Sequence, residues 1–152
     1  MNNAKLLTLI AAAGSLALLL GAFAFQHLGG LAPCKLCLWQ RWPHVAAVLI
    51  GAAVLALGNR ALNWLGAAAM AVCAGIALYH TGVERAWWEG PSTCTSSAAG
   101  DVSADEFFNN IVNAPLIRCD EVAWSLAGLS MASWNGILSL VLMAVWLRAA
   151  TR

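Results

Sequence analysis

Residues 6–25 read LLTLIAAAGSLALLLGAFAF, an apolar stretch without a single charged residue. A helix of about 20 such residues crosses the hydrocarbon core of a bilayer. This stretch therefore predicts a membrane-spanning helix. Lys5 before it and Ala22-Phe23-Ala24 near its end resemble the flanks of a secretory signal peptide. We expect the segment to be retained, because its apolar run is longer than that of a typical signal peptide.

Three further apolar stretches follow, at residues 38–58, 61–79 and 125–147. All are rich in small residues, as in Gly66-Ala67-Ala68-Ala69, and small residues let helices pack closely within lipid. The pattern predicts an all-α, polytopic membrane protein, a four-transmembrane-helix bundle formed by one domain, residues 1–152. The two longer loops, residues 26–37 and 80–124, then lie on the same side of the bilayer.

The overall composition agrees with this prediction. Of the 152 residues, 61% are hydrophobic and 10% are charged, against roughly 45–50% and 25% in soluble domains. The mean hydropathy is +0.74. A chain of this length has too little interior to hide so much apolar surface, which excludes a soluble domain or a disordered tail. The net charge of +1 offers no basic surface for nucleic acid, so the expected partner is the lipid bilayer.

The charges indicate an orientation. All seven acidic residues lie between the third and fourth spans. The basic residues divide equally between the two sides, with Lys5, Arg60, Arg148 and Arg152 on the side of the termini and Lys35, Arg41, Arg85 and Arg118 on the other. Both termini and the short 59–60 turn carry cations, and acidic residues count little in the positive-inside rule. We therefore expect both termini in the cytoplasm and the two longer loops outside.

The chain has five cysteines. Cys73 falls in the middle of the third span, where a cysteine is most simply a small packing residue. Cys34 and Cys37 lie in the first outer loop, and Cys94 and Cys119 lie in the second. If the termini are cytoplasmic, these four face the oxidising side of the membrane, where disulfides persist.

Three interpretations of these four cysteines compete. A zinc site fits the Cys34-x-x-Cys37 spacing, but Cys94 and Cys119 form no second tight pair. Inert structural disulfides are a second possibility, although a short C-x-x-C loop is a poor staple. Redox exchange is the third, because C-x-x-C holds two sulfurs close together and often activates one thiol. Two pairs on one face favour electrons passing between the pairs.

The surroundings of Cys37 favour redox chemistry. Pro33 fixes the backbone just before Cys34, and Cys37 stands near the start of the second span, where the helix dipole favours an anion. Arg41 follows at i+4 on the same helix face and can stabilise a thiolate. An arginine at the membrane rim can equally extend toward lipid headgroups, and the spacing leaves both interpretations open.

These motifs resemble those of a known family. Residues 33–41, PCKLCLWQR, are similar to the C-x-L-C-x-x-[QE]-R signature of the DsbB family of bacterial inner-membrane disulfide-bond formation proteins. Tyr79-His80-Thr81, then Trp87-Trp88 and Pro91-x-x-Cys94, form a second match. Cys119 followed by residues 124–135, WSLAGLSMASWN, forms a third. The resemblance extends over essentially the whole chain in order, and the only notable variation, Gln40 in place of Glu, also occurs in the family.

The resemblance implies a thiol–quinone oxidoreductase of the bacterial inner membrane. Such an enzyme re-oxidises a DsbA-like periplasmic thioredoxin-fold protein and passes the electrons to a membrane quinone, ubiquinone or menaquinone. Residue by residue, Cys94 matches the cysteine that the partner attacks, Cys119 the one that exchanges with the inner pair, and Cys34 the one that receives this exchange. At the quinone, the resemblance implies three residues: Cys37, Arg41 and His80. Disulfide exchange needs no metal, so no metal ligand is expected.

The second outer loop carries a further signal. Ser103-Ala104-Asp105-Glu106 reads as a helix capping box, and apolar residues then recur with helical spacing up to Val112. This pattern predicts a short interfacial helix, resting on the membrane surface or docked on the loop itself. A surface helix would tether the segment that carries Cys94 and Cys119.

Several alternatives remain open at this stage. A vitamin K epoxide reductase-like enzyme also couples C-x-x-C to quinone, but places that motif near the end of its bundle sequence. A paralogue dedicated to a single client, or a non-catalytic membrane protein with structural disulfides, would also carry these cysteines. The sequence does not distinguish ubiquinone from menaquinone, and four cysteines allow three disulfide pairings.

Overall fold

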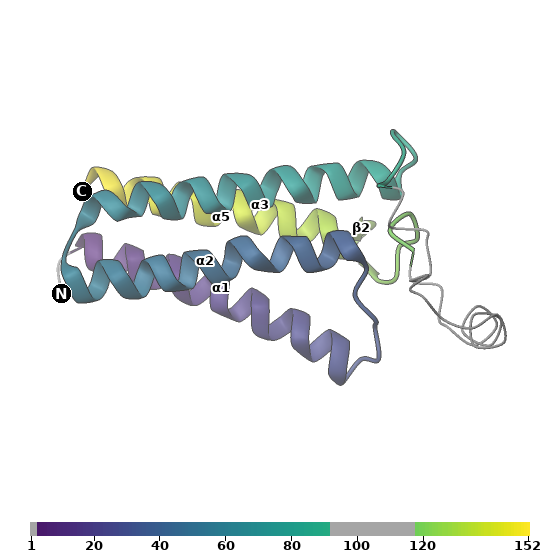
Figure 1. Ribbon diagram of the computed structural model, residues 1–152, viewed down its shortest axis with the longest axis horizontal. Helices are drawn as coiled ribbons and strands as arrows, with labels where there is room; N and C mark the ends of the chain where they lie inside the picture. Colours follow the sequence, from purple (N-terminus) through teal and green to yellow (C-terminus); the bar gives the residue numbers. More distant parts are fainter. Residues whose placement is uncertain (1–2, 92–117) are drawn as a thin grey trace, which may run out of the picture.

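The computed structural model describes residues 3–91 and 118–152. Four long helices run side by side along the molecule (Figure 1). Their bounds are α1 Asn3–His27, α2 Lys35–Leu57, α3 Asn63–Glu84 and α5 Met131–Thr151. A 3-10 turn, η1 Arg60–Leu62, leads into α3. Each of the four is long and apolar enough to cross a membrane, which confirms the predicted four-helix membrane bundle. The predicted interfacial helix, residues 103–112, and Cys94 lie outside the described residues.

The connections place the chain termini and the cysteines at opposite ends of the bundle. α1 begins, and α5 ends, at the end where the turn at residues 58–62 joins α2 to α3 (Figure 1). The segment of residues 28–34 joins α1 to α2 at the other end, where α3 also ends and α5 begins. Cys34, Cys37 and Cys119 therefore meet at a single end of the bundle, as the sequence predicts.

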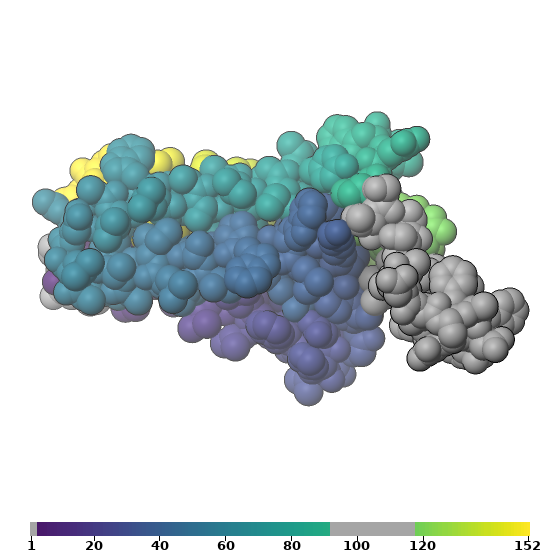
Figure 2. Space-filling view, in the orientation of Figure 1, coloured from purple at the N-terminus to yellow at the C-terminus, as the bar shows by residue number. Residues whose placement is uncertain are grey.

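Small residues allow the helices to approach closely around one large side chain. Trp146 of α5 is fully buried among Ala11, Ala47, Ala67 and Met70. A Cβ atom on Gly66 of α3 would lie 2.5 Å from the Trp146 ring. The glycine is thus required for the contact between α3 and α5. Side chains of α2 and α3 cover one face of the bundle along its length (Figure 2).

The end of α3 and the start of α5 differ most from the expected spans. α3 continues to Glu84, beyond the expected end at residue 79, so that His80 lies within a helix. α5 begins at Met131 because β1 (Ser125–Leu126) and β2 (Leu129–Ser130) form a small antiparallel hairpin before it. Ala127 and Gly128 at its tip have positive φ angles of 52° and 76°. Apolar content alone does not distinguish such a hairpin from the start of a span.

Candidate redox site

Cys34 and Cys37 lie at the first turn of α2. Cys34 is the N-cap residue, and its Sγ accepts a hydrogen bond of 3.2 Å from the backbone N–H of Cys37. The two Sγ atoms are 2.7 Å apart, and both cysteines are free. Cys34 has the extended backbone of an N-cap residue, with φ −72° and ψ 170°, and Pro33 before it fixes its own φ angle. The C-x-x-C motif thus places two thiols side by side at a helix N-terminus, where they can interconvert with a disulfide.

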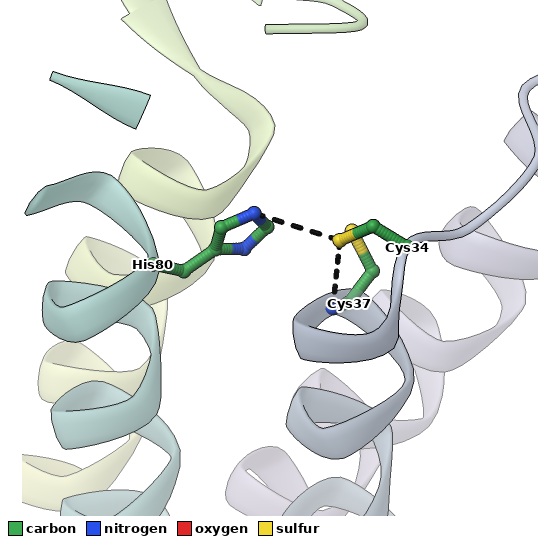
Figure 3. Close-up of side chains that lie close together, drawn as sticks. All are labelled: Cys34, Cys37 and His80. Carbon is green, nitrogen blue, oxygen red and sulfur yellow. Dashed lines mark hydrogen bonds between the residues drawn. The ribbon is translucent and has the colours of Figure 1, made fainter. Parts of the chain in front are cut away.

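His80 faces this pair from the neighbouring helix. Its Nε2 atom lies 3.5 Å from Cys34 Sγ, and the imidazole extends from α3 across to the sulfur (Figure 3). Glu84 lies one turn further along α3, with Oε1 3.9 Å from the same Nε2 atom. The Glu84 carboxylate also accepts a hydrogen bond from the Ser130 hydroxyl at the start of α5. An acid–base pair, His80 and Glu84, therefore stands beside the thiols.

Cys119 belongs to the same buried cluster as the first pair. It is 1% exposed and forms a buried cluster with Cys34, Leu36 and Val83, against which Cys37 also packs. Cys119 is disulfide-bonded, and its backbone interacts with the His80 side chain. Because Cys34 and Cys37 are free, the bonded partner of Cys119 is neither of them. The structure therefore brings a disulfide-bonded cysteine and a dithiol into one buried cluster.

A chain of polar side chains leads from His80 into the bundle. His80 Nδ1 is 2.9 Å from Gln40 Nε2, and Asn135 Nδ2 donates to Gln40 Oε1 at 2.7 Å. Asn135 Oδ1 is 3.0 Å from Nε2 of the buried His44. Because Gln40 Oε1 accepts from Asn135, its Nε2 amide donates to His80 Nδ1. The proton of the neutral imidazole is then on Nε2, the nitrogen that faces Cys34.

The sequence pattern alone does not identify Gln40, Asn135, His44 or Glu84 as site residues. The signal available was their polarity within or at the ends of apolar spans, which is costly and often functional. Their convergence could not be read from spacing, because they come from three helices. Cys73, expected as a packing residue, is fully buried in the core, where its Sγ lies 3.4 Å from His44 Nε2.

A cavity of about 360 Å³ opens beside the thiols. Its wall includes apolar residues of α1 and α5, such as Leu18, Phe25 and Leu138. Its polar lining comprises Cys34, Cys37, Gln40, Arg41, His44, His80, Glu84, Arg118, Glu121 and Asn135. Mostly apolar cavities with a few convergent polar groups are typical of sites for small organic ligands.

Arg41 stands at the cavity one helical turn beyond Cys37. Its Nη1 atom donates a 2.7 Å hydrogen bond to Gln26 Oε1, and its guanidinium lies 4.9 Å from the ring centre of Phe23. Gln26 and Phe23 both belong to α1. Two side chains of α1 therefore hold the guanidinium at the cavity wall.

The surroundings of Cys34 change the pKa of its thiol. The hydrogen bond with Cys37, together with burial, raises the pKa of the Cys34 thiol above its ordinary value. Cys34 therefore keeps its proton while both cysteines are reduced.

Arg118, next to Cys119, pairs with Asp120 at 2.6 Å and lowers the pKa of that carboxyl group. This ion pair is solvent-exposed and contributes little to stability.

Comparison with known proteins agrees with this arrangement. The family model described as "Disulfide bond formation protein DsbB" matches residues 4–149. A disulfide bond formation protein B of Shewanella amazonensis is 31% identical over 147 residues, covering 91% of this chain and 85% of the relative. Proteins of the same name from Stutzerimonas stutzeri and Albidiferax ferrireducens are each 28% identical, covering 96% and 88% of this chain and 95% and 84% of the relatives. No solved structure matches.

The family match covers nearly the whole chain, and it coincides with the C-x-x-C pair, the disulfide-bonded Cys119 and the four spanning helices. This chain belongs to the DsbB family of membrane-embedded disulfide bond formation proteins.

Proposed function

We propose that the chain re-oxidises a DsbA-like dithiol partner and passes the two electrons to a membrane quinone. One observation carries the proposal. The Cys34–Cys37 dithiol shares a buried cluster with the disulfide-bonded Cys119 and also lines the largely apolar cavity. It therefore occupies the position required of an intermediate carrier between a soluble dithiol and a lipid-soluble acceptor.

The cavity residues suit a quinone. Its apolar wall accommodates a ring and the beginning of an isoprenoid tail, and Arg41 and His80 supply hydrogen-bond donors for carbonyl oxygens. Nδ1 of His44, a buried lining residue, has no hydrogen-bond partner among the described residues. Because His44 Nε2–H donates to Asn135 Oδ1, this nitrogen is an acceptor, which suits a hydroxyl group of the quinol product. A bound quinone supplies the two-electron oxidant of the reaction.

Disulfide exchange accounts for the protein steps. A thiolate of the partner attacks the outer disulfide, which we assign to Cys94 and Cys119, and the partner leaves as a disulfide while both cysteines become thiols. The Cys119 thiolate then attacks Cys34 of an inner disulfide and releases the Cys37 thiolate; Cys94 closes on Cys119 and releases Cys34. Two electrons and two protons now reside on the inner pair. The free Cys34 and Cys37 and the bonded Cys119 support this order of steps.

Neighbouring side chains stabilise the thiolate and accept protons while the inner pair passes its electrons to the quinone. Arg41 places a permanent positive charge one turn from Cys37, where a thiolate needs compensation. His80 Nε2, 3.5 Å from Cys34 Sγ, accepts the Cys34 proton as the disulfide re-forms once the Gln40 and Asn135 amides turn over and the imidazole proton moves to Nδ1. Glu84, beside His80, is positioned to take part in the same transfer.

The same proposal includes an orientation. The end of the bundle that carries the cysteines faces the periplasm, and both termini face the cytoplasm of a bacterial inner membrane. Cations at both termini and in the 59–60 turn support this orientation. It brings the outer cysteines to the side where a DsbA-like partner resides.

Reconstitution tests the proposed function. Purified protein is mixed with a reduced thioredoxin-fold dithiol and either ubiquinone or menaquinone, and quinol formation is followed by absorbance. We expect Cys37→Ser and Cys94→Ser to abolish quinol formation, whereas Cys73→Ser retains it, because Cys73 does not line the cavity. Full activity of Cys37→Ser, or dithiol oxidation without quinone, would refute the proposal.

A further inference from the structure

We propose that the reduced Cys34–Cys37 pair and His80 form a binding site for one zinc ion, and that oxidation of the pair abolishes this site. The two Sγ atoms and a ring nitrogen of His80 all lie within 4.8 Å of one another (Figure 3). Two of these residues come from the first turn of α2 and the third from α3, so helix packing preassembles the three ligands.

The donor set suits zinc. Zn²⁺ favours four tetrahedral ligands drawn from Cys, His and carboxylate groups. Oε1 of Glu84, 3.9 Å from His80 Nε2, does not belong to the group of three atoms within 4.8 Å of one another, so a water molecule supplies the fourth ligand. On a tetrahedral ion with Zn–S bonds of about 2.3 Å, the sulfurs stand about 3.8 Å apart. Cys34 and Cys37, now at 2.7 Å, therefore separate by about 1 Å, a small side-chain rotation.

The residues behind His80 provide the outer shell that such a ligand needs. A histidine that binds metal through Nε2 usually donates its Nδ1–H to an oxygen acceptor. Gln40 is in hydrogen-bond contact with His80 Nδ1 at 2.9 Å. If the amides of Gln40 and Asn135 both turn over, His80 donates to Gln40, Gln40 to Asn135, and Asn135 to His44. Every contact in the chain is kept with its direction reversed, so the chain accommodates either tautomer of His80.

Zinc binding at this site is a proton exchange without electron transfer. The ion replaces the two thiol protons of Cys34 and Cys37, binds the neutral imidazole, and releases two protons to solvent. In the oxidised state both sulfurs share a disulfide and are lost as thiolate ligands. The site is thus specific for the reduced state, and a bound ion holds the pair reduced. Zinc binding does not depend on the proposed function. Inhibition of dithiol oxidation by bound zinc does rest on it.

The ligand set differs from the zinc interpretation that the sequence suggests. The sequence spacing suggests a site formed by Cys34, Cys37, Cys94 and Cys119, in which Cys94 and Cys119 form no tight pair. The third ligand here is a histidine 46 residues beyond Cys34. Its proximity depends on how α2 packs against α3.

The test measures metal binding on the full-length protein with Cys94→Ser and Cys119→Ser, so that the inner pair is the only reactive dithiol. The reduced protein in detergent is titrated with Co²⁺, and Zn²⁺ is then added in competition. We expect one ion per chain, thiolate-to-cobalt absorption with the visible bands of tetrahedral cobalt, and two protons released. His80→Ala should weaken Zn²⁺ binding by more than about tenfold, the lower bound for losing even an outer-shell partner.

Two controls make the outcome decisive. His27→Ala alters an exposed histidine at the end of α1 and should bind Zn²⁺ as tightly as the parent. Cys37→Ser removes a ligand on the other helix, retains a side chain of similar size, and should also weaken binding. Equal affinity of His80→Ala and the parent, or Zn²⁺ binding by the oxidised protein, would overturn the proposal. These readouts need neither quinone nor partner, so loss of the proposed oxidase activity would leave them unaffected.

Discussion

Nε2 of His80 lies 3.5 Å from Sγ of Cys34, although 46 residues separate them in sequence. The contact exists because α3 extends one turn beyond the apolar run that predicts its span, which carries His80 up to the first turn of α2. A thiol and an imidazole held this close can exchange a proton directly.

Replacing His80 tests this contact. We expect His80→Ala to lower kcat for quinone-coupled dithiol oxidation by about 10²-fold, the lower range for loss of general acid–base catalysis. The loss should be greatest near neutral pH and smaller at alkaline pH, where solvent removes thiol protons more readily. Stopped-flow quinol formation across a pH series measures it. Wild-type kcat in His80→Ala at neutral pH would remove His80 from the mechanism.

Arg41 is expected to act on quinone binding. Loss of a hydrogen bond to a charged group costs about 1.5–3 kcal/mol, so Arg41→Met should raise the KM for quinone roughly 10–100-fold. Arg41→Lys should recover only part of this, because a lysine lacks the planar guanidinium that Gln26 and Phe23 hold. Arg148→Met, in the last turn of α5 at the opposite end, is the matched control and should leave KM unchanged.

The raised pKa of Cys34 predicts the reactivity of the reduced protein. A group with a raised pKa stays protonated as the pH passes its ordinary value, here 9.0. Alkylation of Cys34, followed by peptide mass spectrometry, should therefore stay slow through pH 9.0. Cys37→Ala removes the larger cause of the shift and leaves burial, so alkylation should begin at lower pH. A parent protein whose Cys34 reacts like an exposed cysteine would contradict this explanation.

The same pKa affects stability. Because the folded-state pKa of Cys34 is raised, its contribution to stability is complete below the unfolded pKa and is lost as the pH rises above it. Above pH 9.0, the melting temperature of the reduced protein should therefore fall more steeply with pH than that of the Cys34→Ala variant. Protein with the inner pair oxidised has no Cys34 thiol, so its melting temperature should not show this additional fall with pH.

Gly66 and Gly75 of α3 form a matched pair for the packing of the bundle. A Cβ at Gly66 would meet the Trp146 ring at 2.5 Å, whereas a Cβ at Gly75 would meet nothing within 4 Å. Gly66→Ala should therefore destabilise the protein by about 1–3 kcal/mol, the usual cost of overpacking. Gly75→Ala should be neutral or slightly stabilising, since alanine favours helix. Thermal unfolding in detergent compares them; equal melting temperatures would contradict the packing of α3 on α5.

The sequence predicts the features that depend on local pattern. The four spans follow from apolar length, and the C-x-x-C motif with Arg41 one turn later follows from helical spacing. The hairpin before α5 was not predicted, because residues 125–130 are as apolar as the span they precede. The chain from His80 through Gln40 to Asn135 was not predicted either, since it needs the relative rotation of three helices, which local pattern does not contain.

The central claim is that the inner dithiol gives its electrons directly to quinone, and single-turnover stoichiometry tests it most directly. Protein with Cys94→Ser and Cys119→Ser is reduced, freed of reductant and mixed with excess quinone; remaining thiols and quinol are then counted. We predict two thiols lost, from Cys34 and Cys37, for each quinol formed, with Cys73 unchanged and no reaction when Cys37 is replaced by Ser. Quinol formation that persists in that variant, or thiols that stay reduced in the parent, would contradict the claim.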